Sequence, residues 1–161
     1  MRLLVLCTHN SARSQMAEGW LRVLAAARGL DLEVWSAGTQ RTQVKAEAVE
    51  VMREVGIDIR GHRSKALAEL PELEFDVVVT VCDAANDVCP VYPAKTRRLH
   101  VSFPDPSGQS LEGWRRVRDG LGEMSRALVE QLRQSGKSLE AASLASRAFE
   151  GLVTGSERSM V

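Results

Sequence analysis

A cysteine and an arginine stand six positions apart near the start of the chain, in the sequence Cys-Thr-His-Asn-Ser-Ala-Arg-Ser over residues 7–14. A loop that leads from a strand into a helix can point successive backbone N–H groups inward, and the helix dipole adds partial positive charge there. Arg13 can grip two oxygens of a bound anion at once. The pattern predicts a site for a tetrahedral oxyanion, with Cys7 as the nucleophile that attacks it.

Cys7 has to be ionised for this reaction, because the thiolate is the nucleophilic form of a cysteine. Helix N-termini and nearby cations stabilise a thiolate, so we expect Cys7 to be mostly ionised near neutral pH. The Ser14 hydroxyl could donate a further hydrogen bond to the sulfur. The residues expected to bind the oxyanion are Thr8, His9, Asn10, Ser11, Ala12, Arg13 and Ser14.

Two other interpretations of this segment compete. A cysteine at a strand end is often simply buried, with the arginine in a surface salt bridge. The order of strand, Cys-x5-Arg-Ser and helix disfavours that interpretation. A nucleotide P-loop is excluded, because the Gly-x4-Gly-Lys-[Ser/Thr] pattern is missing.

A carboxylic acid that could serve the same site comes much later in the chain. Departure of an oxygen from a tetrahedral anion needs a proton, usually from a positioned acid. Asp105 lies between two prolines, which restrict the backbone around it. The alternative is a turn aspartate, since Asp-Pro also suits a turn. Beside Cys7 and Arg13 we favour the general acid.

Cys82 and Cys89 complete the set of three cysteines and are spaced as Cys-x6-Cys. No export signal is evident, so we expect a reducing cytosol, where static disulfides are rare. A zinc site is disfavoured, because a short Cys-x2–4-Cys spacing and paired histidines are missing. Structural burial of both cysteines stays open as an alternative. Only a redox role accounts for all three together.

Strand and helix signals alternate along the chain. Apolar and β-branched runs predict strands at residues 3–6, 33–37, 75–81 and 99–103. Apolar residues at helical spacing predict helices over 16–24, 46–55 and 114–132, the first of them capped by Ser11 and Ser14. This order predicts an α/β fold: a single domain with a doubly wound, four-stranded parallel sheet flanked by helices.

The candidate residues occupy similar places relative to these strands. Cys7, Cys82 and Asp105 each fall just past the end of a predicted strand. Ligands of doubly wound sheets bind beyond the carboxyl ends of the strands. We therefore expect the three side chains to gather at one edge of the sheet.

The bulk composition limits the classes of partner. The chain has 161 residues, and 21 basic side chains balance 21 acidic ones, which suggests no general affinity for nucleic acid or an anionic membrane. No apolar run reaches the roughly 20 residues of a membrane span. We expect a cytoplasmic monomer without a bound metal or cofactor. Residues 1–134 would form the domain and residues 135–161 a partly ordered tail.

The sequence resembles the low-molecular-weight tyrosine phosphatase fold in Cys7-x5-Arg13-Ser14 and in Asp105-Pro106. Within it the closer resemblance is to thioredoxin-coupled arsenate reductases, with the Cys82/Cys89 pair as its most specific element. The stretches that carry the resemblance are residues 7–19, 36–39, 51–59, 79–83 and 89–90, within roughly residues 1–134. It implies an enzyme that takes arsenate as substrate and thioredoxin as electron donor.

The resemblance also implies a relay of three cysteines. Cys7 attacks arsenate, and Asp105 protonates the departing oxygen. Cys82 then attacks the Cys7 sulfur, so that arsenite leaves and a disulfide joins Cys7 to Cys82. Cys89 attacks Cys82 in turn, which moves the disulfide to Cys82 and Cys89, where thioredoxin reduces it.

This sequence departs from the family pattern in places. His9 stands where relatives often have glycine, which can change the loop geometry or the anion affinity. Some members bind potassium through an Asn, a Glu and oxygen atoms of a later loop. Asn10 and Glu18 are present, but Arg63 and Lys65 occupy the later stretch, so we do not predict this ion.

Two other functions compete with arsenate reduction. A phosphatase of this fold needs only Cys7, Arg13 and Asp105, and phosphate is nearly isosteric with arsenate. Tyrosine phosphatases of the fold usually follow Asp-Pro with an aromatic residue that holds an aryl ring, whereas Ser-Gly follows here. Some residual phosphatase activity is expected. A non-catalytic oxyanion sensor is the third interpretation, and it would need neither Asp105 nor the Cys82/Cys89 pair.

Overall fold

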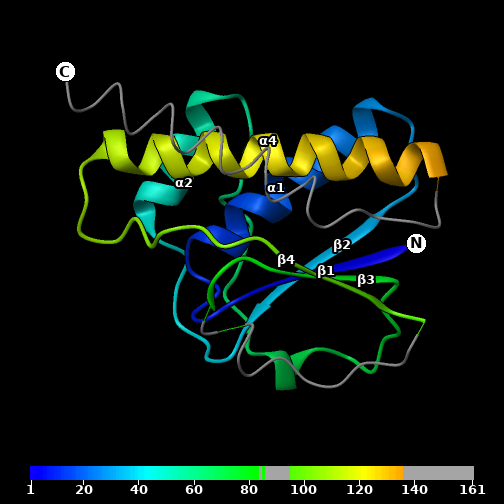
Figure 1. Cartoon of the computed structure of the whole chain (residues 1–161). Helices are drawn as coiled ribbons and strands as arrows, with labels where there is room; N and C mark the ends of the chain where they lie inside the picture. Colours follow the sequence, from blue (N-terminus) through cyan, green and yellow to red (C-terminus); the bar gives the residue numbers. More distant parts are fainter. Residues whose placement is uncertain (84, 86–94, 136–161) are drawn as a thin grey trace.

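The computed structural model of the chain describes residues 1–83, 85 and 95–135 (Figure 1). Within them one parallel sheet has the strand order β2-β1-β3-β4. The strands are β1 (Arg2–Cys7), β2 (Glu33–Gly38), β3 (Val77–Thr80) and β4 (Arg97–His100). The helices are α1 (Arg13–Ala27), α2 (Ala46–Glu54) and α4 (Leu111–Ser135), and a 3-10 turn, η1, spans Leu67–Glu69. The predicted fold class is confirmed.

Strand β1 lies at the centre of the sheet, between β2 and β3. Leu3, Leu4 and Val5 are fully buried, as expected for a strand that is covered on both faces and paired along both edges. The pairing sets Leu6 beside Thr80 of β3 and Cys7 beside Gly38 of β2. The continuous apolar run at the start of the sequence therefore forms the core strand, and it delivers Cys7 to the end of the sheet.

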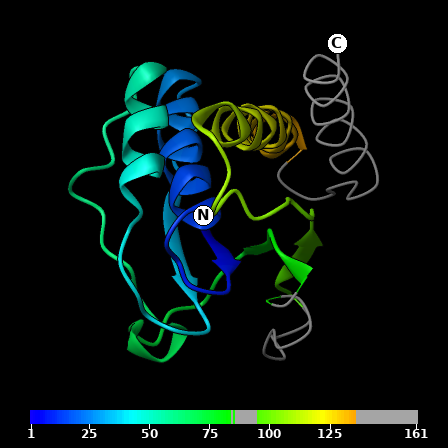
Figure 2. The same cartoon turned by 90° about the vertical axis from the view of Figure 1, so that its left-hand side faces the viewer.

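The three described helices lie together over one face of the sheet, and η1 lies on the other side (Figures 1 and 2). Helix α1 packs against α4, where the Trp20 ring meets Gly122. A Cβ at Gly122 would come within 2.9 Å of that ring, so glycine lets the two helices approach. Trp20 Nε1 also donates a hydrogen bond of 3.0 Å to the Arg118 carbonyl oxygen.

A buried arginine joins α2 to α4. Arg118 Nη1 donates to the Val51 carbonyl oxygen at 3.0 Å and to Glu54 Oε1 at 2.8 Å. Glu54 also accepts a hydrogen bond from Arg115, and these contacts lower the pKa of Glu54 to about 2. The carboxylate is therefore charged throughout the physiological pH range, and it holds the end of α2 against α4.

The fourth strand begins earlier than the sequence predicts, at Arg97 instead of Leu99. Arg97 and Arg98 pair with Val77 and Val78 of β3, but β4 is the last strand of the sheet and both arginines are exposed. An edge strand can carry charged residues on its open side. Hydrophobic patterning therefore misses its first two residues.

The strand order creates a switch point in the topology. The chain crosses from β1 to β2 in one direction, and β3 lies on the opposite side of β1. Ligands of such sheets bind where the order reverses, beyond the carboxyl ends of the strands. Cys7 ends β1 and Cys82 follows β3, so both lie at this point. None of the helices in the described part of the chain is long and apolar enough to span a membrane.

Gly38 ends β2 against the loop of residues 7–14. A Cβ at this position would lie 2.6 Å from the Thr8 carbonyl oxygen and 2.7 Å from the Asn10 nitrogen, so any side chain must displace that loop. We expect Gly38→Ala to lower the free energy of unfolding by about 1–3 kcal/mol, measured by urea denaturation. Gly61→Ala is the matched control, because nothing lies within 4 Å of its added Cβ. Equal effects of the two substitutions would contradict the prediction.

Candidate active site

Cys7 is buried at the end of β1, and two donors face its sulfur. The Ser14 hydroxyl oxygen lies 2.8 Å from Sγ, and the Asn10 backbone N–H donates to Sγ at 3.2 Å. Asn10 Nδ2 in turn donates to the Ser14 oxygen at 2.7 Å. Because the Ser14 oxygen accepts this hydrogen bond with one lone pair, its own proton is free to point at the Cys7 sulfur. The resulting chain of donors stabilises negative charge on Cys7.

The predicted capping role of Ser11 and Ser14 is wrong. Helix α1 begins at Arg13, its N-cap is Ala12, and no side chain caps it. The reason is that the Ser14 hydroxyl is used by Cys7 and Asn10 instead. The open N-terminus of the helix keeps its backbone N–H groups available for an anion.

Asn10 shapes the loop through an unusual backbone conformation. Its φ is 49°, in the left-handed region, which Asn tolerates better than most residues. The side chain is fully buried. Nδ2 donates to the hydroxyls of Ser14 and Ser36, and Oδ1 accepts hydrogen bonds from Gln15 Nε2 and the Lys65 backbone N–H. Asn10 therefore braces the loop from beneath.

A cavity of about 240 Å³ opens above the loop. The residues that line it are Cys7, His9, Ser11, Ala12, Arg13, Lys45, Asp105 and Ser107. The structure thus brings Cys7, Arg13 and Asp105 around one hollow, although Asp105 is far away in sequence. Four of the predicted oxyanion-binding residues line it with Cys7, while Asn10 and Ser14 lie below and Thr8 turns toward Cys82. Lys45 and Ser107 are lining residues that the sequence analysis missed.

Arg13 connects the loop to the segment that carries Asp105. Its Nη1 donates a hydrogen bond of 3.0 Å to the Phe103 carbonyl oxygen. Its other guanidinium donors bind no other group among the described residues. A tetrahedral anion in the cavity would find them at its wall.

Asp105 is held in a tight turn. Its Oδ1 accepts a hydrogen bond of 3.0 Å from the Ser107 backbone N–H. Partial burial by itself would raise the pKa of Asp105, but the hydrogen bonds from Ser107 and the charges of Arg13 and Lys45 outweigh it and lower that pKa. The hydrogen bond from Ser107 agrees with the turn interpretation, and the general-acid role of Asp105 stays a prediction.

Cys82 lies beside the same loop. Its side chain is buried, and its Sγ is 3.3 Å from Oγ1 of Thr8, the residue after Cys7. Cys7 and Cys82 are both free thiols. The next residue, Asp83, is fastened by His100, whose Nε2 lies 2.8 Å from Asp83 Oδ1. Cys89 lies outside the described residues, as does the predicted tail beyond Ser135.

A buried carboxylate with a histidine partner supports the loop from behind. Glu18 Oε2 lies 2.9 Å from His62 Nδ1, and both side chains are almost completely covered. The same Nδ1 is 3.0 Å from Gln15 Oε1, and Gln15 Nε2 donates to Asn10. Burial by itself would raise the pKa of Glu18, but the hydrogen bond and charge of His62, with the charge of Arg22, outweigh it and lower that pKa.

The sequence predicts no role for Gln15, although it lies in the stretch 7–19 that resembles the family, and it gives no signal for His62, which stands in no recognisable motif. Glu18 was noted there only as part of a potassium site. In this structure Glu18 faces His62, and Asn10 Oδ1 accepts two protein hydrogen bonds. Within the described residues no group of three or more His, Cys, Asp or Glu side chains is arranged to hold a metal ion.

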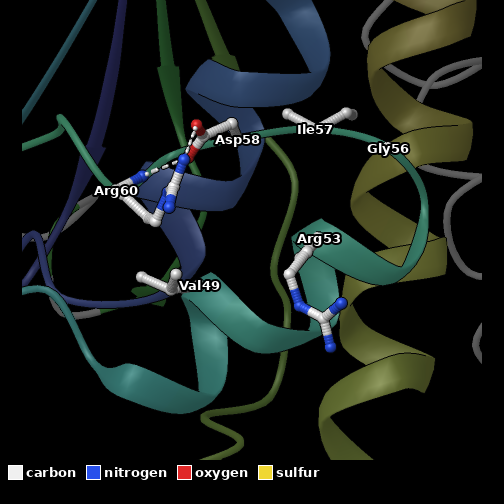
Figure 3. Close-up of a pocket in the computed structure, with 6 residues that line it drawn as sticks. All are labelled: Val49, Arg53, Gly56, Ile57, Asp58 and Arg60. Atoms are coloured by element: carbon white, nitrogen blue, oxygen red, sulfur yellow. Dashed lines mark hydrogen bonds and ion pairs between the residues drawn. The ribbon is translucent and has the colours of Figure 1, made fainter.

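A separate hollow of about 310 Å³ lies at the end of α2 (Figure 3). It is lined by Val49, Arg53, Gly56, Ile57, Asp58 and Arg60. Arg60 is paired with Asp58 at 2.9 Å, and Arg53 is paired with Glu50 at 2.6 Å. None of the oxyanion-loop residues reaches this hollow, so we place the chemistry at Cys7 and not here.

Comparison with known proteins identifies the family. The model of the family described as "Low molecular weight phosphotyrosine protein phosphatase" matches residues 2–138. The chain belongs to this family. It is 42% identical to arsenate reductase 2 of Staphylococcus saprophyticus over 118 residues, which cover 73% of this chain and 88% of that protein.

Solved structures of the family superimpose on the chain. A crystal structure of a low molecular weight protein tyrosine phosphatase from T. tengcongensis matches with a TM-score of 0.73 and 32% identity, covering 82% of this chain and 99% of that one. An arsenate reductase in the oxidized state matches with a TM-score of 0.72 and 32% identity, covering 81% and 98%. The predicted resemblance to arsenate reductases of this superfamily is confirmed.

The Glu18–His62 pair gives a prediction about stability. His62→Ala leaves a buried carboxylate without its nearest partner, so the free energy of unfolding should fall on the order of 3 kcal/mol at pH 7, measured by urea denaturation. The folded-state pKa of Glu18 lies below its ordinary value of 4.5. The contribution of this carboxylate is therefore complete above that value and is lost as the pH falls through the lower folded pKa.

The matched control is the double variant Glu18→Gln/His62→Ala, which removes the stranded charge. It should recover part of the stability that His62→Ala loses. If the double variant is less stable than His62→Ala, the pair is not what supports this region.

Proposed function

We propose that this protein reduces arsenate to arsenite with Cys7, Cys82 and Cys89, and that thioredoxin supplies the electrons. The observation that carries the proposal is the separation of 3.3 Å between Cys82 Sγ and Thr8 Oγ1. It sets a second free thiol directly beside the loop that holds the nucleophile. Hydrolysis has no use for such a thiol, whereas reduction requires one. The relatives named as arsenate reductases support the same choice.

The first step is attack on the oxyanion. Arsenate binds over the loop, gripped by Arg13 and by backbone N–H groups at the start of α1. The Cys7 thiolate forms a bond to arsenic, and one oxygen leaves as water after it receives a proton from Asp105. The cations beside Asp105 favour its charged form, and a bound dianion offsets their field. Substrate binding therefore helps Asp105 to carry the proton that it donates.

The second step transfers the electrons. Cys82, as a thiolate, attacks the Cys7 sulfur and forms a disulfide with it. The sulfur–arsenic bond breaks, and its electron pair stays on arsenic, which is reduced from the +5 to the +3 state and leaves as arsenite. Thr8 Oγ1 is within hydrogen-bonding reach of Cys82 Sγ and can stabilise that thiolate before it attacks.

The third step regenerates Cys7. Cys89 attacks the Cys82 sulfur, and Cys7 departs as a thiolate that Ser14 and the Asn10 N–H stabilise. The disulfide between Cys82 and Cys89 is then reduced by the two thiols of thioredoxin. In this proposed reaction no bound cofactor takes part and the protein acts as a monomer. It acts in the reducing cytoplasm, where the three cysteines stay available as thiols.

Phosphate-monoester hydrolysis is the second candidate function, and the lining of the cavity supports it. Cys7, Arg13 and Asp105 line one hollow, and these groups suffice to hydrolyse a phosphate monoester. Ser107 lines that hollow where an aromatic residue would hold an aryl ring. We therefore propose hydrolysis as a residual activity of the same site.

Arg13 is predicted to be indispensable for either chemistry. Arg13→Lys keeps the charge but removes the planar pair of donors, so it is not conservative at an oxyanion site. We expect kcat/KM for arsenate to fall at least about a hundredfold, which corresponds to roughly 3 kcal/mol. Arg28→Lys, at the exposed end of the same helix, is the control and should react normally. Normal kinetics in Arg13→Lys would show that the anion is held elsewhere.

The cysteine variants separate reduction from hydrolysis. Cys89→Ser should release about one arsenite per enzyme molecule and stop with Cys7 joined to Cys82, because no thiol remains to free Cys7. Cys82→Ser should release essentially none. The measurement is arsenite formed with thioredoxin, its reductase and NADPH, followed by mass spectrometry of the protein.

Hydrolysis of a phosphate ester provides the internal control. It should continue in both variants, since water releases the phosphate from Cys7 without help from either thiol. Many thioredoxin-driven turnovers by Cys89→Ser would rule out the three-cysteine relay.

A further inference from the structure

A second hollow adjoins the oxyanion cavity. It has a volume of about 790 Å³ and is lined by His9, Ser11, Thr42, Gln43, Val44, Lys45 and Ala46. His9, Ser11 and Lys45 line both spaces, so the two lie side by side. Arsenate fills only the oxyanion cavity in the proposed reduction. The larger space beside it is unexplained by that reaction.

The wall of this hollow is fastened to the oxyanion loop. The Lys45 N–H donates to the Ser11 carbonyl oxygen at 2.8 Å, and Thr42 Oγ1 donates to the His9 carbonyl oxygen at 3.1 Å. Ser64 Oγ donates to the same His9 oxygen at 2.9 Å and accepts from the Thr42 N–H. The hollow is thus formed before any ligand binds, and it keeps a constant position relative to Cys7.

The charge of this wall is positive. Lys45 is exposed at the start of α2, and its ammonium group has no ion-pair partner among the described residues. Arg41, four residues earlier, is paired with Glu69 at 3.1 Å and lines neither space. Of the residues that the structure describes, no Asp or Glu lines the larger hollow, and Asp105 is the one that lines the oxyanion cavity.

We propose that this hollow is a subsite for the leaving group of a phosphate monoester. It selects esters whose leaving group carries a negative charge of its own, in addition to the charge of the phosphoryl group. Lys45 is its specificity-determining residue, and His9 offers a further donor. The inference rests on the proposed reactivity of Cys7, Arg13 and Asp105 and adds a substrate class to it. A tetrahedral phosphoryl group sits over the loop, and the anionic part of the ester lies along the 42–46 wall.

The reaction is hydrolysis and involves no change of oxidation state. The Cys7 thiolate forms a bond to phosphorus, the bond from phosphorus to the ester oxygen breaks, and the leaving alcohol takes a proton from Asp105. Water then attacks the phosphocysteine and gives a proton to the Asp105 carboxylate, the phosphorus–sulfur bond breaks, and inorganic phosphate and the Cys7 thiolate are released. Cys82 and Cys89 take no part.

Two nearly isosteric esters test the subsite: 4-carboxyphenyl phosphate and 4-carbamoylphenyl phosphate, which differ by one negative charge. In the unmodified protein we expect kcat/KM to be roughly tenfold higher for the carboxylate, and the preference to shrink at high salt. Lys45→Gln should reduce the ratio to about one. Because the ratio compares two esters on the same variant, any effect of Lys45 on Asp105 largely cancels. Arg41→Gln is the control, with the same charge change outside both cavities, and should keep the tenfold preference.

Calorimetry with the same two esters and the Cys7→Ser variant compares their affinities directly. It tests the subsite even where turnover is slow. A tenfold preference that Lys45→Gln abolishes supports the subsite. Equal affinities for the two esters, or a preference that survives Lys45→Gln, would overturn it. Failure of the proposed reduction is seen separately, as absence of arsenite in the thioredoxin assay.

Discussion

The left-handed backbone of Asn10 is the constraint on which the site depends. This conformation costs most residues about 1–2 kcal/mol, and Asn visits it more readily. Four side-chain hydrogen bonds, to Ser14, Ser36, Gln15 and the Lys65 backbone, hold it there in a fully buried position. The consequence is a loop in which the Asn10 N–H is directed at the Cys7 sulfur.

The same residue links the reactive sulfur to a buried charge pair. Gln15 joins Asn10 to His62, and His62 lies 2.9 Å from the buried carboxylate of Glu18. Gly38 closes the loop from the side, because only a residue without a side chain fits against Thr8 and Asn10. Buried hydrogen bonds therefore hold the loop on the side of the protein interior. The cavity on its other side is bordered by exposed residues such as Lys45 and Asp105.

The fold by itself does not decide between the two chemistries of this family. A phosphatase and an arsenate reductase superimpose on the chain about equally well, with TM-scores of 0.73 and 0.72. Function has to be argued from the site. Oxyanion attack needs Cys7, Arg13 and an acid, which both chemistries share. The Cys82 thiol beside Thr8 has a role in the proposed reduction and none in hydrolysis, and the hollow beside Lys45 has a role in the proposed ester hydrolysis and none in reduction.

The sequence by itself determined the four parallel strands and the loop of residues 7–14 between strand and helix, because both depend on short, continuous patterns. A buried strand, a Cys-x5-Arg-Ser loop and an amphipathic helix interact mainly with their neighbours in the chain. Only the tertiary structure decided what surrounds that loop. Lys45 is placed at the cavity by the hydrogen bond from its backbone N–H to the Ser11 carbonyl oxygen. His62 contacts Glu18, which lies 44 positions earlier in the sequence. Such contacts depend on how the loops cross over the sheet, and residue types alone do not specify that path.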